Sequence, residues 1–494
     1  MDKAVGSTLR ETLNFIDGQY RPSTSGKTFA NINPATGEQV SIVHEADKAD
    51  VDAAVKAARK AVDGDWGKMP VPKRIEMVSA IAAEINNRFD DFLEAEIADT
   101  GKPHDLASHL DIPRGAANFQ IFADVMKQHH GEAFAMPTPD GTGAINITSD
   151  RPRGVIGVVC PWNLPLLLMT WKVGPAMACG NAVVVKPSEE TPSTASLLGE
   201  VMNKVGIPHG AYNVVNGFGP DSAGEFLVSH PQVDAITFTG ETRTGEAIMR
   251  NAATGVRPVS FELGGKNFGI VFADCDMDKA IEGTLRSAFA NCGQVCLNTE
   301  NLLVERPIFD EFVKRLKAGA EKLKPGAPHD KACNMGPLVS DEHRRKVLSY
   351  YEIANKDGAN IVTGGGIPKM PKELEGGFWI QPTIWTGLKD DSRVVTEEVF
   401  GPCCHIRPFD TEEEALRIAN GNQYGLACSI WTENLSRAHR IGPKMEVGIC
   451  WINCWFLRDL RTPFGGSKKS GIGREGGEYS LEFYLEKSNI CIKL

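Results

Sequence analysis

The sequence lacks the features that mark membrane-spanning, exported and metal-binding proteins. No apolar run approaches the ~20 residues that a transmembrane helix needs. Residues 1–11 are polar and contain no apolar core of a signal peptide. The 12 cysteines form no closely spaced framework, and no His/Cys cluster has the spacing of metal ligands. We therefore expect a cytoplasmic protein with reduced thiols and no catalytic metal.

The sequence also has no blocks of like charge, no internal repeat and no low-complexity segment. The net charge of −10 is spread along the chain, so we expect neither nucleic acid nor an anionic membrane as a partner. A hydrophobic content of 42% and a charged content of 23% are typical of a soluble globular protein. With 494 residues the chain is too long for one ordinary core, and two or more domains are expected.

Short apolar segments alternate with amphipathic ones through the middle of the chain. Strands are expected over 155–159, 182–186, 212–215, 235–239 and 259–263. Helices are expected between them over 166–178, 192–205, 220–229 and 244–253. Strands that are apolar throughout are buried on both faces, so this pattern predicts a parallel sheet covered by helices. A second α/β series follows, with strands expected over 268–272, 301–304, 360–362, 404–406, 428–431 and 448–453.

Helical periodicity dominates the segment before this alternation. It predicts helices over 49–62, 72–87, 89–99 and 107–128, after a hairpin that turns at Asp17-Gly18. Residues 131–150 are rich in Thr, Gly and Pro, and we expect a hairpin there that projects from the body. The closing segment 481–494 ends in an alternating pattern, which we expect to add an edge strand to a neighbouring subunit.

The segment Phe289 to Cys296 supplies the best candidate for a nucleophile. Helical periodicity stops at Asn291-Cys292-Gly293, where the glycine breaks the helix. Cys296 follows this break, on a loop held by rigid elements, where reactive groups are often found. Cys292 is its positional rival, and we interpret it as structural. From the local sequence alone, a buried inert thiol is the more common interpretation of either cysteine.

Two strand ends carry residues that suit a nucleotide. Phe238-Thr239-Gly240 joins a strand to a helix, and with Gly245 it lets the backbone approach a phosphate at the helix N-terminus. An ordinary strand–helix turn has the same pattern. Lys186 can pair with ribose hydroxyls or phosphate, whereas Glu189 can accept hydrogen bonds from ribose and would repel a 2′-phosphate. We therefore predict NAD rather than NADP.

Seven motifs, in the right order, give the chain a resemblance to the aldehyde dehydrogenase superfamily over nearly its whole length. They are Pro161-Trp162-Asn163-Leu164-Pro165, Lys186-Pro187-Ser188-Glu189, Phe238-Thr239-Gly240, Phe261 to Lys266, Asn291 to Cys296, Glu397 to Pro402 and Pro463 to Lys468. The resemblance implies an α/β fold with a Rossmann-type NAD-binding domain, an α/β catalytic domain and a small β oligomerisation element. The expected ranges are 1–128 with 153–263, then 264–466, and 129–152 with 467–494. A homodimer or homotetramer is also implied.

The resemblance further implies roles for single residues. Cys296 corresponds to the nucleophile, Glu262 to the base that hydrolyses the thioester, and the Asn163 amide with the Cys296 N–H to the oxyanion hole. In isolation, Glu262 would be a surface charge and Asn163 a turn residue. The implied cofactor-binding residues are Pro161, Trp162, Lys186, Ser188, Glu189, Gly219, Phe238, Thr239, Gly240, Gly245, Leu263, Glu398 and Phe400. Within this set, Glu398 and Phe400 correspond to the pair that holds the nicotinamide ribose and ring.

The finer similarity is to family members that oxidise 2-hydroxymuconic 6-semialdehyde in aromatic ring-cleavage pathways, with the 2-amino compound as the alternative substrate. Both are six-carbon dienals with a carboxylate at the far end. A buried carboxylate is bound best by guanidinium groups, which give bidentate and permanently charged contacts. Arg114 and Arg458 are at the matching positions, and we expect Trp171 and Phe464 to wall the conjugated chain.

Several alternatives stay open at this point. Arg114 can instead be a solvated helix residue paired with Asp111, and Arg458 can pair with Asp459 or yield its role to Arg461. A coenzyme A-acylating relative would pass the thioester to a thiol, which the presence of Glu262 argues against. A non-catalytic structural member is expected to lose the nucleophile, base or oxyanion amide, and this sequence keeps all three. A general aldehyde dehydrogenase with another substrate range is a further alternative.

Overall fold

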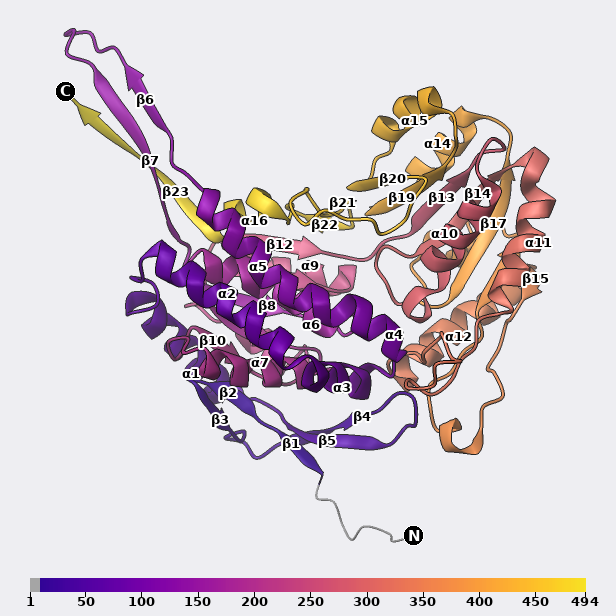
Figure 1. Cartoon of the computed structure of the whole chain (residues 1–494), viewed down its shortest axis with the longest axis horizontal. Coiled ribbons are helices and arrows are strands. Elements are labelled where there is room, and N and C mark those ends of the chain that lie inside the picture. The colour runs from indigo at the N-terminus through magenta and orange to yellow at the C-terminus, as the bar shows by residue number, and fades with distance from the viewer. Residues whose placement is uncertain (1–8) are drawn as a thin grey trace.

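Two large, mostly parallel sheets carry the fold (Figure 1), as seen in a computed structural model that describes residues 9–494. The polar segment 1–8 of the sequence lies outside the described residues. The first sheet has the order β22-β12-β11-β8-β9-β10-β2-β3. Its strands are β2 (Asn14–Ile16), β3 (Gln19–Arg21), β8 (Val155–Val159), β9 (Ala182–Lys186), β10 (Tyr212–Val214), β11 (Ala235–Thr239), β12 (Val259–Glu262) and β22 (Gly471–Ile472). The five strands predicted between residues 155 and 263 are confirmed.

Helices cover both faces of this first sheet, as its apolar strands require. They are α1 (Lys48–Asp63), α2 (Val71–Asn87), α3 (Phe89–Thr100), α5 (Ile112–Gln128), α6 (Pro165–Ala178), α7 (Ser193–Lys204), α8 (Ala223–Val228) and α9 (Thr242–Ala253). The strand order reverses at β8, because β9 and β10 follow on one side of it and β11 and β12 on the other. Such a switch point opens a crevice beyond the carboxyl ends of the strands, where ligands bind.

The predicted long helix over 107–128 is interrupted near its start. A short helical turn, α4 (His104–Leu106), and a π-helical turn, Ala107–Asp111, precede α5. A π-turn adds one residue and shifts the side chains that follow. Helix α5 then packs closely on α6, because Gly115 and Gly174 lie at their contact: a Cβ added at Gly115 would come 2.6 Å from Leu166.

The second sheet has the order β15-β16-β17-β14-β13-β19-β20. Its strands are β13 (Asn267–Val271), β14 (Thr299–Glu305), β15 (Asn360–Thr363), β16 (Thr383–Thr386), β17 (Cys403–Phe409), β19 (Ala427–Trp431) and β20 (Ile449–Ile452). The helices around it are α10 (Met277–Phe289), α11 (Phe309–Ala320), α12 (Asp341–Lys356), α13 (Arg393–Thr396), α14 (Glu412–Asn420) and α15 (Leu435–Ile441). The six predicted strands are confirmed, and β16 was not predicted because this four-residue strand lies between Pro382 and Gly387.

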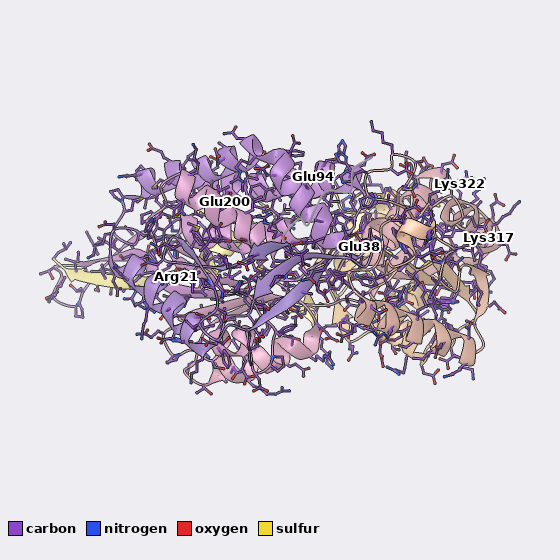
Figure 2. All side chains as sticks on the ribbon, turned by 90° about the horizontal axis from the view of Figure 1, so that it is seen from below. Arg21, Glu38, Glu94, Glu200, Lys317 and Lys322 are labelled. Atoms are coloured by element: carbon purple, nitrogen blue, oxygen red, sulfur yellow. The ribbon has the colours of Figure 1, made fainter. Side chains whose placement is uncertain are left out.

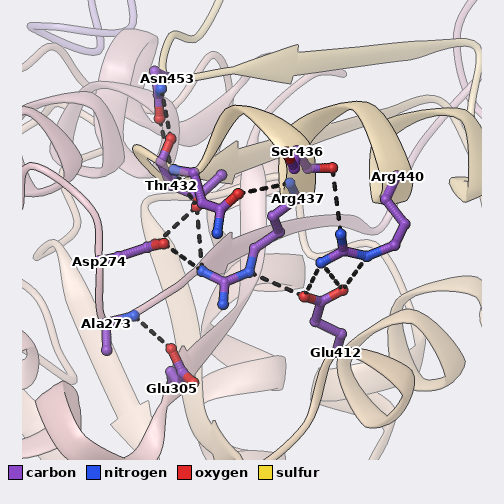
Figure 3. Close-up of polar contacts among 10 residues, drawn as sticks. Ala273, Asp274, Glu305, Glu412, Thr432, Ser436, Arg437, Arg440 and Asn453 are labelled. Carbon is purple, nitrogen blue, oxygen red and sulfur yellow. Dashed lines mark hydrogen bonds and ion pairs between the residues drawn. The ribbon is translucent and has the colours of Figure 1, made fainter.

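A network of ion pairs fastens α15 to its surroundings (Figure 3). Arg437 donates to Asp274, which follows β13, at 2.6 Å and to Glu412 of α14 at 3.1 Å. Arg440 also pairs with Glu412 at 2.6 Å, so one carboxylate joins two arginines. Because several charges share partners, this network contributes more than an isolated surface pair.

A three-stranded sheet projects from the body (Figure 1). The predicted hairpin is confirmed as β6 (Ala133–Met136) and β7 (Ala144–Pro152). The closing segment is confirmed as an edge strand, and its pairing with a neighbouring subunit stays a prediction, because its outer edge has no partner strand within residues 9–494. Within the chain, β23 (Leu485–Lys493) pairs antiparallel with β7 along its whole length. This pairing is favoured because the hairpin presents a long unpaired edge.

Most of the expected range 467–494 lies outside the projecting sheet. Strand β21 (Ser467–Lys468) pairs with β18 (Tyr424–Gly425), β22 pairs with β12, and α16 (Gly477–Tyr484) contacts α5 and α6. A small sheet of β1 (Arg10–Thr12), β5 (Gln39–His44) and β4 (Thr28–Ile32) was not predicted. The domain limits given above stay a prediction.

The surface is covered by charges of both signs. Within residues 9–494 no helix is long and apolar enough to cross a membrane. Figure 2 labels six exposed charged residues on the face that it shows: Arg21, Glu38, Glu94, Glu200, Lys317 and Lys322.

Candidate active site

The loop that carries Cys296 is strained and tightly held. Helix α10 ends at Phe289, and Asn291 and Cys292 then adopt left-handed φ values of 52° and 55°. The Gln294 side chain bridges the loop, since its Nε2 donates to Asn291 O at 3.1 Å and its Oε1 accepts the Val339 N–H at 2.9 Å. Left-handed residues other than glycine concentrate at functional sites, where the surroundings hold them in place.

The two cysteines of this loop differ in accessibility. Cys292 is 1% exposed and belongs to a core cluster with Val347 and Tyr351. Cys296 is partly exposed and packs against the apolar cluster that includes Trp455 and Phe464. A nucleophile has to reach its substrate, so the geometry favours Cys296 over Cys292.

Desolvation and nearby carboxylates keep the Cys296 thiol protonated. Burial and the charges of Glu262 and Glu398 raise its pKa to about 12, while Arg458 acts in the opposite direction. The backbone N–H of Cys296 has no acceptor on another residue within the described part of the chain. It is therefore available to stabilise the oxyanion that forms when a thiolate attacks a carbonyl carbon.

Asn163 is tied to the Cys296 loop from two sides. Its Nδ2 donates to Gln294 O at 2.9 Å, and its carbonyl accepts from Asn291 Nδ2 and from Lys102 Nζ, both at 3.0 Å. Lys102 in turn pairs with Asp111 at 2.6 Å, at the residue where the π-turn ends. The Asn163 amide is thus fixed in position with one N–H still free for an oxyanion.

Glu262 lies at the end of β12 and is 5% exposed. Desolvation and the neighbouring charge of Glu475 raise its pKa to about 8, against the opposing effects of Lys172 and Arg458. Its Oε1 has no hydrogen-bond partner within residues 9–494. A Cβ added at Gly465 would lie 2.9 Å from this oxygen, so the glycine leaves room for the carboxylate. A buried carboxylate with such a pKa is suited to general base catalysis near neutral pH.

The residues expected to bind the adenosine half of NAD gather at the crevice of the first sheet. The ends of β8 and β9 are joined there, because the Cys160 N–H, next to Pro161, donates to Lys186 O at 3.0 Å. Lys186 pairs with Glu189 at 3.1 Å, and Ser188 between them is buried. Ribose hydroxyls fit this charged pair, which offers both donors and acceptors.

The turn after β11 also fits a dinucleotide. The buried Thr239 Oγ1 has no partner within residues 9–494, and Gly240 donates its N–H to Glu262 O at 3.0 Å. A Cβ at Gly245 would come 2.8 Å from Leu263, so this glycine lets α9 pack closely on the end of β12. Gly219 faces open space, and Phe238 is buried beneath Gly240. The residues present therefore fit NAD.

The residues expected at the nicotinamide end lie on the far side of the crevice. Glu398 Oε1 accepts the Gly265 N–H at 2.8 Å. Phe400 meets Trp162 edge to face, with ring centroids 5.3 Å apart. Gly293 of the Cys296 loop lies against Gly401, so a nicotinamide bound here would lie near the thiol.

Two arginines lie together without an anionic partner. Arg458 is stacked between two rings, 3.7 Å from the Phe464 centroid and 4.2 Å from that of Trp171. Its Nε and Nη2, and the Nε of Arg114, are buried and have no hydrogen-bond acceptor within the described residues. Desolvation and the charge of Arg114 lower the pKa of Arg458 to about 9. Two partly buried cations with inaccessible, unpaired N–H groups suit an anion, because an unpaired charge in such a place is costly.

The alternative partners considered for these arginines are contradicted. Asp111 pairs with Lys102 and not with Arg114. Asp459 pairs with Arg461 at 2.6 Å, on the exposed surface, which leaves Arg458 free. Within residues 9–494 no group of three or more His, Cys, Asp or Glu side chains is placed to hold a metal ion.

A sequence profile described as the aldehyde dehydrogenase family matches residues 20–490. The chain belongs to this family. It is 68% identical to "2-hydroxymuconic semialdehyde dehydrogenase" of Pseudomonas sp. (strain CF600), over 98% of this chain and 100% of that relative. It is 55% identical to "2-aminomuconic 6-semialdehyde dehydrogenase" of Pseudomonas sp, over 98% and 99% of the two chains. The fold matches a solved NAD+ complex of aldehyde dehydrogenase from Bacillus cereus with a TM-score of 0.94, at 37% identity, over 98% and 97% of the two chains.

Family membership and the expected fold class are confirmed by these matches. Other residues of the site were not predicted from the sequence: Lys102, Lys172 and Glu475. Lys172 pairs with Glu475 at 2.7 Å, and both are buried. A sequence signal existed for Lys172, because it is the one charged residue within the apolar helix α6. A charge in such a helix needs a buried partner.

The electrostatic description of Cys296 predicts its reactivity. Arg458→Met removes the cation that lowers the Cys296 pKa, so alkylation of Cys296 by iodoacetamide at pH 8 should slow severalfold. Peptide mass spectrometry measures the rate at Cys296 and Cys292 separately. Arg461→Met, which removes an exposed charge, is the matched control. An unchanged or faster rate in the Arg458 variant contradicts this description.

Proposed function

We propose that the chain oxidises 2-hydroxymuconic 6-semialdehyde to 2-hydroxymuconate, with NAD as the hydride acceptor. The observation that carries this proposal is the partly buried couple Arg114 and Arg458, which forms no ion pair within residues 9–494 and lies next to the apolar cluster around Cys296. A substrate with an aldehyde at one end and a carboxylate at the other satisfies both groups. The names and high identity of the Pseudomonas relatives support the same substrate.

The proposed reaction begins with attack of the Cys296 thiolate on the aldehyde carbon, which gives a thiohemiacetal. Its oxyanion accepts hydrogen bonds from the Asn163 amide and the Cys296 N–H. Such preorganised donors contribute about 3–4 kcal/mol each to stabilising the transition state. NAD held at Glu398 and Phe400 would supply the acceptor for the hydride that leaves the substrate carbon. The thioester that remains on Cys296 is the product of this oxidation.

Glu262 is proposed as the base in both halves of the reaction. It takes the proton of Cys296 before attack, and later the proton of the water that hydrolyses the thioester. Overall, aldehyde, NAD+ and water give carboxylate, NADH and two protons. Lys172 and Glu475 are positioning residues here, since their buried pair sets the charge around Glu262.

The arginine couple is proposed to bind the distal carboxylate of the substrate. The Arg458 guanidinium is held flat between Trp171 and Phe464, which presents its N–H edge while its faces are covered. Arg114 is placed by the close α5–α6 contact at its neighbour Gly115. The flat aromatic rings of Trp171 and Phe464 suit contact with a flat conjugated chain.

2-Aminomuconic 6-semialdehyde is the second candidate substrate. It carries the same aldehyde and carboxylate, and a relative with 55% identity is named for it. A coenzyme A-acylating reaction would not need a general base that activates water. Glu262 suits that base, because its Oε1 has no hydrogen-bond partner within residues 9–494 and its charge acts on the Cys296 thiol. Assays with each semialdehyde, with and without coenzyme A, separate these cases.

The compartment and the assembly are part of the proposal. All 12 cysteines lie in the described residues and are free thiols, which supports a reducing cytoplasm. The projecting sheet carries an apolar face that the chain itself does not cover: paired strand positions place Ile145 and Ile147 beside Ile492 and Ile490. Both isoleucines of β23 are about half exposed. We propose that a second subunit covers this face in a homodimer, or in a homotetramer built from two dimers.

The carboxylate role predicts a substrate-dependent effect. Arg114→Ala and Arg458→Ala should each raise KM for the semialdehyde acid by about 10–100-fold, the size of a lost charge-assisted contact. KM for hexanal, which has no carboxylate, should change far less. Steady-state assays of NADH formation measure both. Arg461→Ala is the control, and equal losses on the two substrates would remove the carboxylate role.

The charge around Glu262 predicts the pH dependence. The rate of thioester hydrolysis should rise with pH through the Glu262 pKa of about 8, because the base acts when deprotonated. Glu475→Gln removes a charge that raises this pKa, so the rising limb should move to lower pH. Lys172→Met removes a charge that lowers it, so the limb should move to higher pH. Shifts in the same direction, measured in kcat–pH profiles, contradict the assignment.

The assembly proposal predicts the effect of charges on the projecting sheet. Ile490→Lys with Ile492→Lys should convert the oligomer to monomers, because four lysines would face one another across a two-fold interface. Sedimentation velocity measures the mass of each species. Asn489→Lys, on the opposite face of the same strand, is the control. An unchanged mass in the double variant would place the interface elsewhere.

A further inference from the structure

The loop 398–400, which carries Glu398 and Phe400, has an unfavourable backbone. Phe400 adopts a left-handed φ of 61°. This conformation costs a residue with a side chain about 1–2 kcal/mol relative to the right-handed one. Something outside the loop has to hold Phe400 in place, and two buried side chains do so.

Glu300 holds the loop from one side. It lies on β14, is 3% exposed, and accepts the backbone N–H groups of Val399 at 3.0 Å and Phe400 at 2.8 Å. Its charge is balanced by Lys266, which is equally buried and forms a short ion pair with it. A carboxylate with two backbone donors and one cation is fully satisfied, so this contact is rigid.

His343 holds the loop from the other side. Its Nε2 lies 2.8 Å from Phe400 O, so this nitrogen carries the hydrogen and donates to the carbonyl. Burial lowers the pKa of His343 to about 4, which keeps the ring neutral. The ring also packs on Trp162, with centroids 5.0 Å apart, and Trp162 in turn meets Phe400. Both peptide groups of Phe400 are therefore bonded, to Glu300 at its N–H and to His343 at its carbonyl.

We propose that Glu300 and His343 are positioning residues that hold the loop 398–400 in the conformation that binds the nicotinamide half of NAD. This inference rests on the proposed function. It assigns a specific consequence to each contact, because neither side chain lies among the residues at the adenosine end, Lys186 to Glu189. Loss of either contact should weaken binding of the whole dinucleotide and leave binding of its adenosine half intact.

Calorimetric titration of the full-length protein with NAD and with AMP tests this inference. Glu300→Gln keeps the shape of the side chain but removes its charge and one acceptor oxygen. The Kd for NAD should rise about tenfold or more, as expected for lost hydrogen bonds to a charged group. The Kd for AMP should stay within twofold of the unchanged protein. Glu305→Gln is the matched control. Glu305 is also a glutamate of β14, and it accepts the backbone N–H of Ala273 at 2.6 Å, away from the loop 398–400.

Two results would overturn the inference. One is an unchanged Kd for NAD in Glu300→Gln, and the other is an equal weakening of NAD and AMP. If Glu300→Gln does not fold, as judged by its thermal melt, the same titrations are made with His343→Phe. This variant keeps an aromatic ring against Trp162 and removes the N–H donor to Phe400. The same selective loss of NAD supports the inference, and unchanged NAD binding overturns it. Failure of the proposed function is a distinct result, because it would be seen as no NAD reduction by the wild-type protein with the semialdehyde, whatever the Kd values for NAD and AMP.

Discussion

The site is built around two partly buried guanidinium groups, for which residues 9–494 provide no ion pair. Burying a charge is costly unless it is paired, and here aromatic faces replace only part of the lost hydration of Arg458. The rest of the structure has to hold this arrangement. The tight α5–α6 packing at Gly115 and Gly174 fixes one side, and the loop from Trp455 to Phe464 fixes the other. We propose that an anionic substrate supplies the ion pair that the arginines lack within residues 9–494.

A second constraint is the meeting of two strained loops between the large sheets. Asn291 and Cys292 on one loop, and Phe400 on the other, all have left-handed backbones. The loops touch where Gly293 lies against Gly401. Their conformations are maintained by buried polar side chains, Gln294 for the first loop and Glu300 with His343 for the second. The Cys296 loop and the loop with Glu398 and Phe400 are thus each held by hydrogen bonds to buried side chains.

The sequence predicts the parts of this structure whose cause is local. The apolar strands from Val155 to Glu262 and the helix break before Cys296 follow from short-range patterns. The pairing of β23 with β7 of its own chain was not predicted, because strand pairing depends on which edge is free in the folded chain. Contacts such as Lys102 to Asn163, 61 residues apart, and Lys172 to Glu475, 303 residues apart, leave no local pattern that names the partner. The roles of Arg114 and Arg458 were open because the sequence does not show which cation each nearby carboxylate selects: Asp111 pairs with Lys102, and Asp459 with Arg461.

The most direct test of the central claim is the rate of NAD reduction by the purified protein with three aldehydes. These are 2-hydroxymuconic 6-semialdehyde, hexanal and benzaldehyde, with the carboxylate product checked by mass. We predict a much higher kcat/KM for the semialdehyde and complete loss of turnover in Cys296→Ala. Equal kcat/KM values for the three aldehydes would contradict the claim that the buried arginines select a substrate with a distal carboxylate.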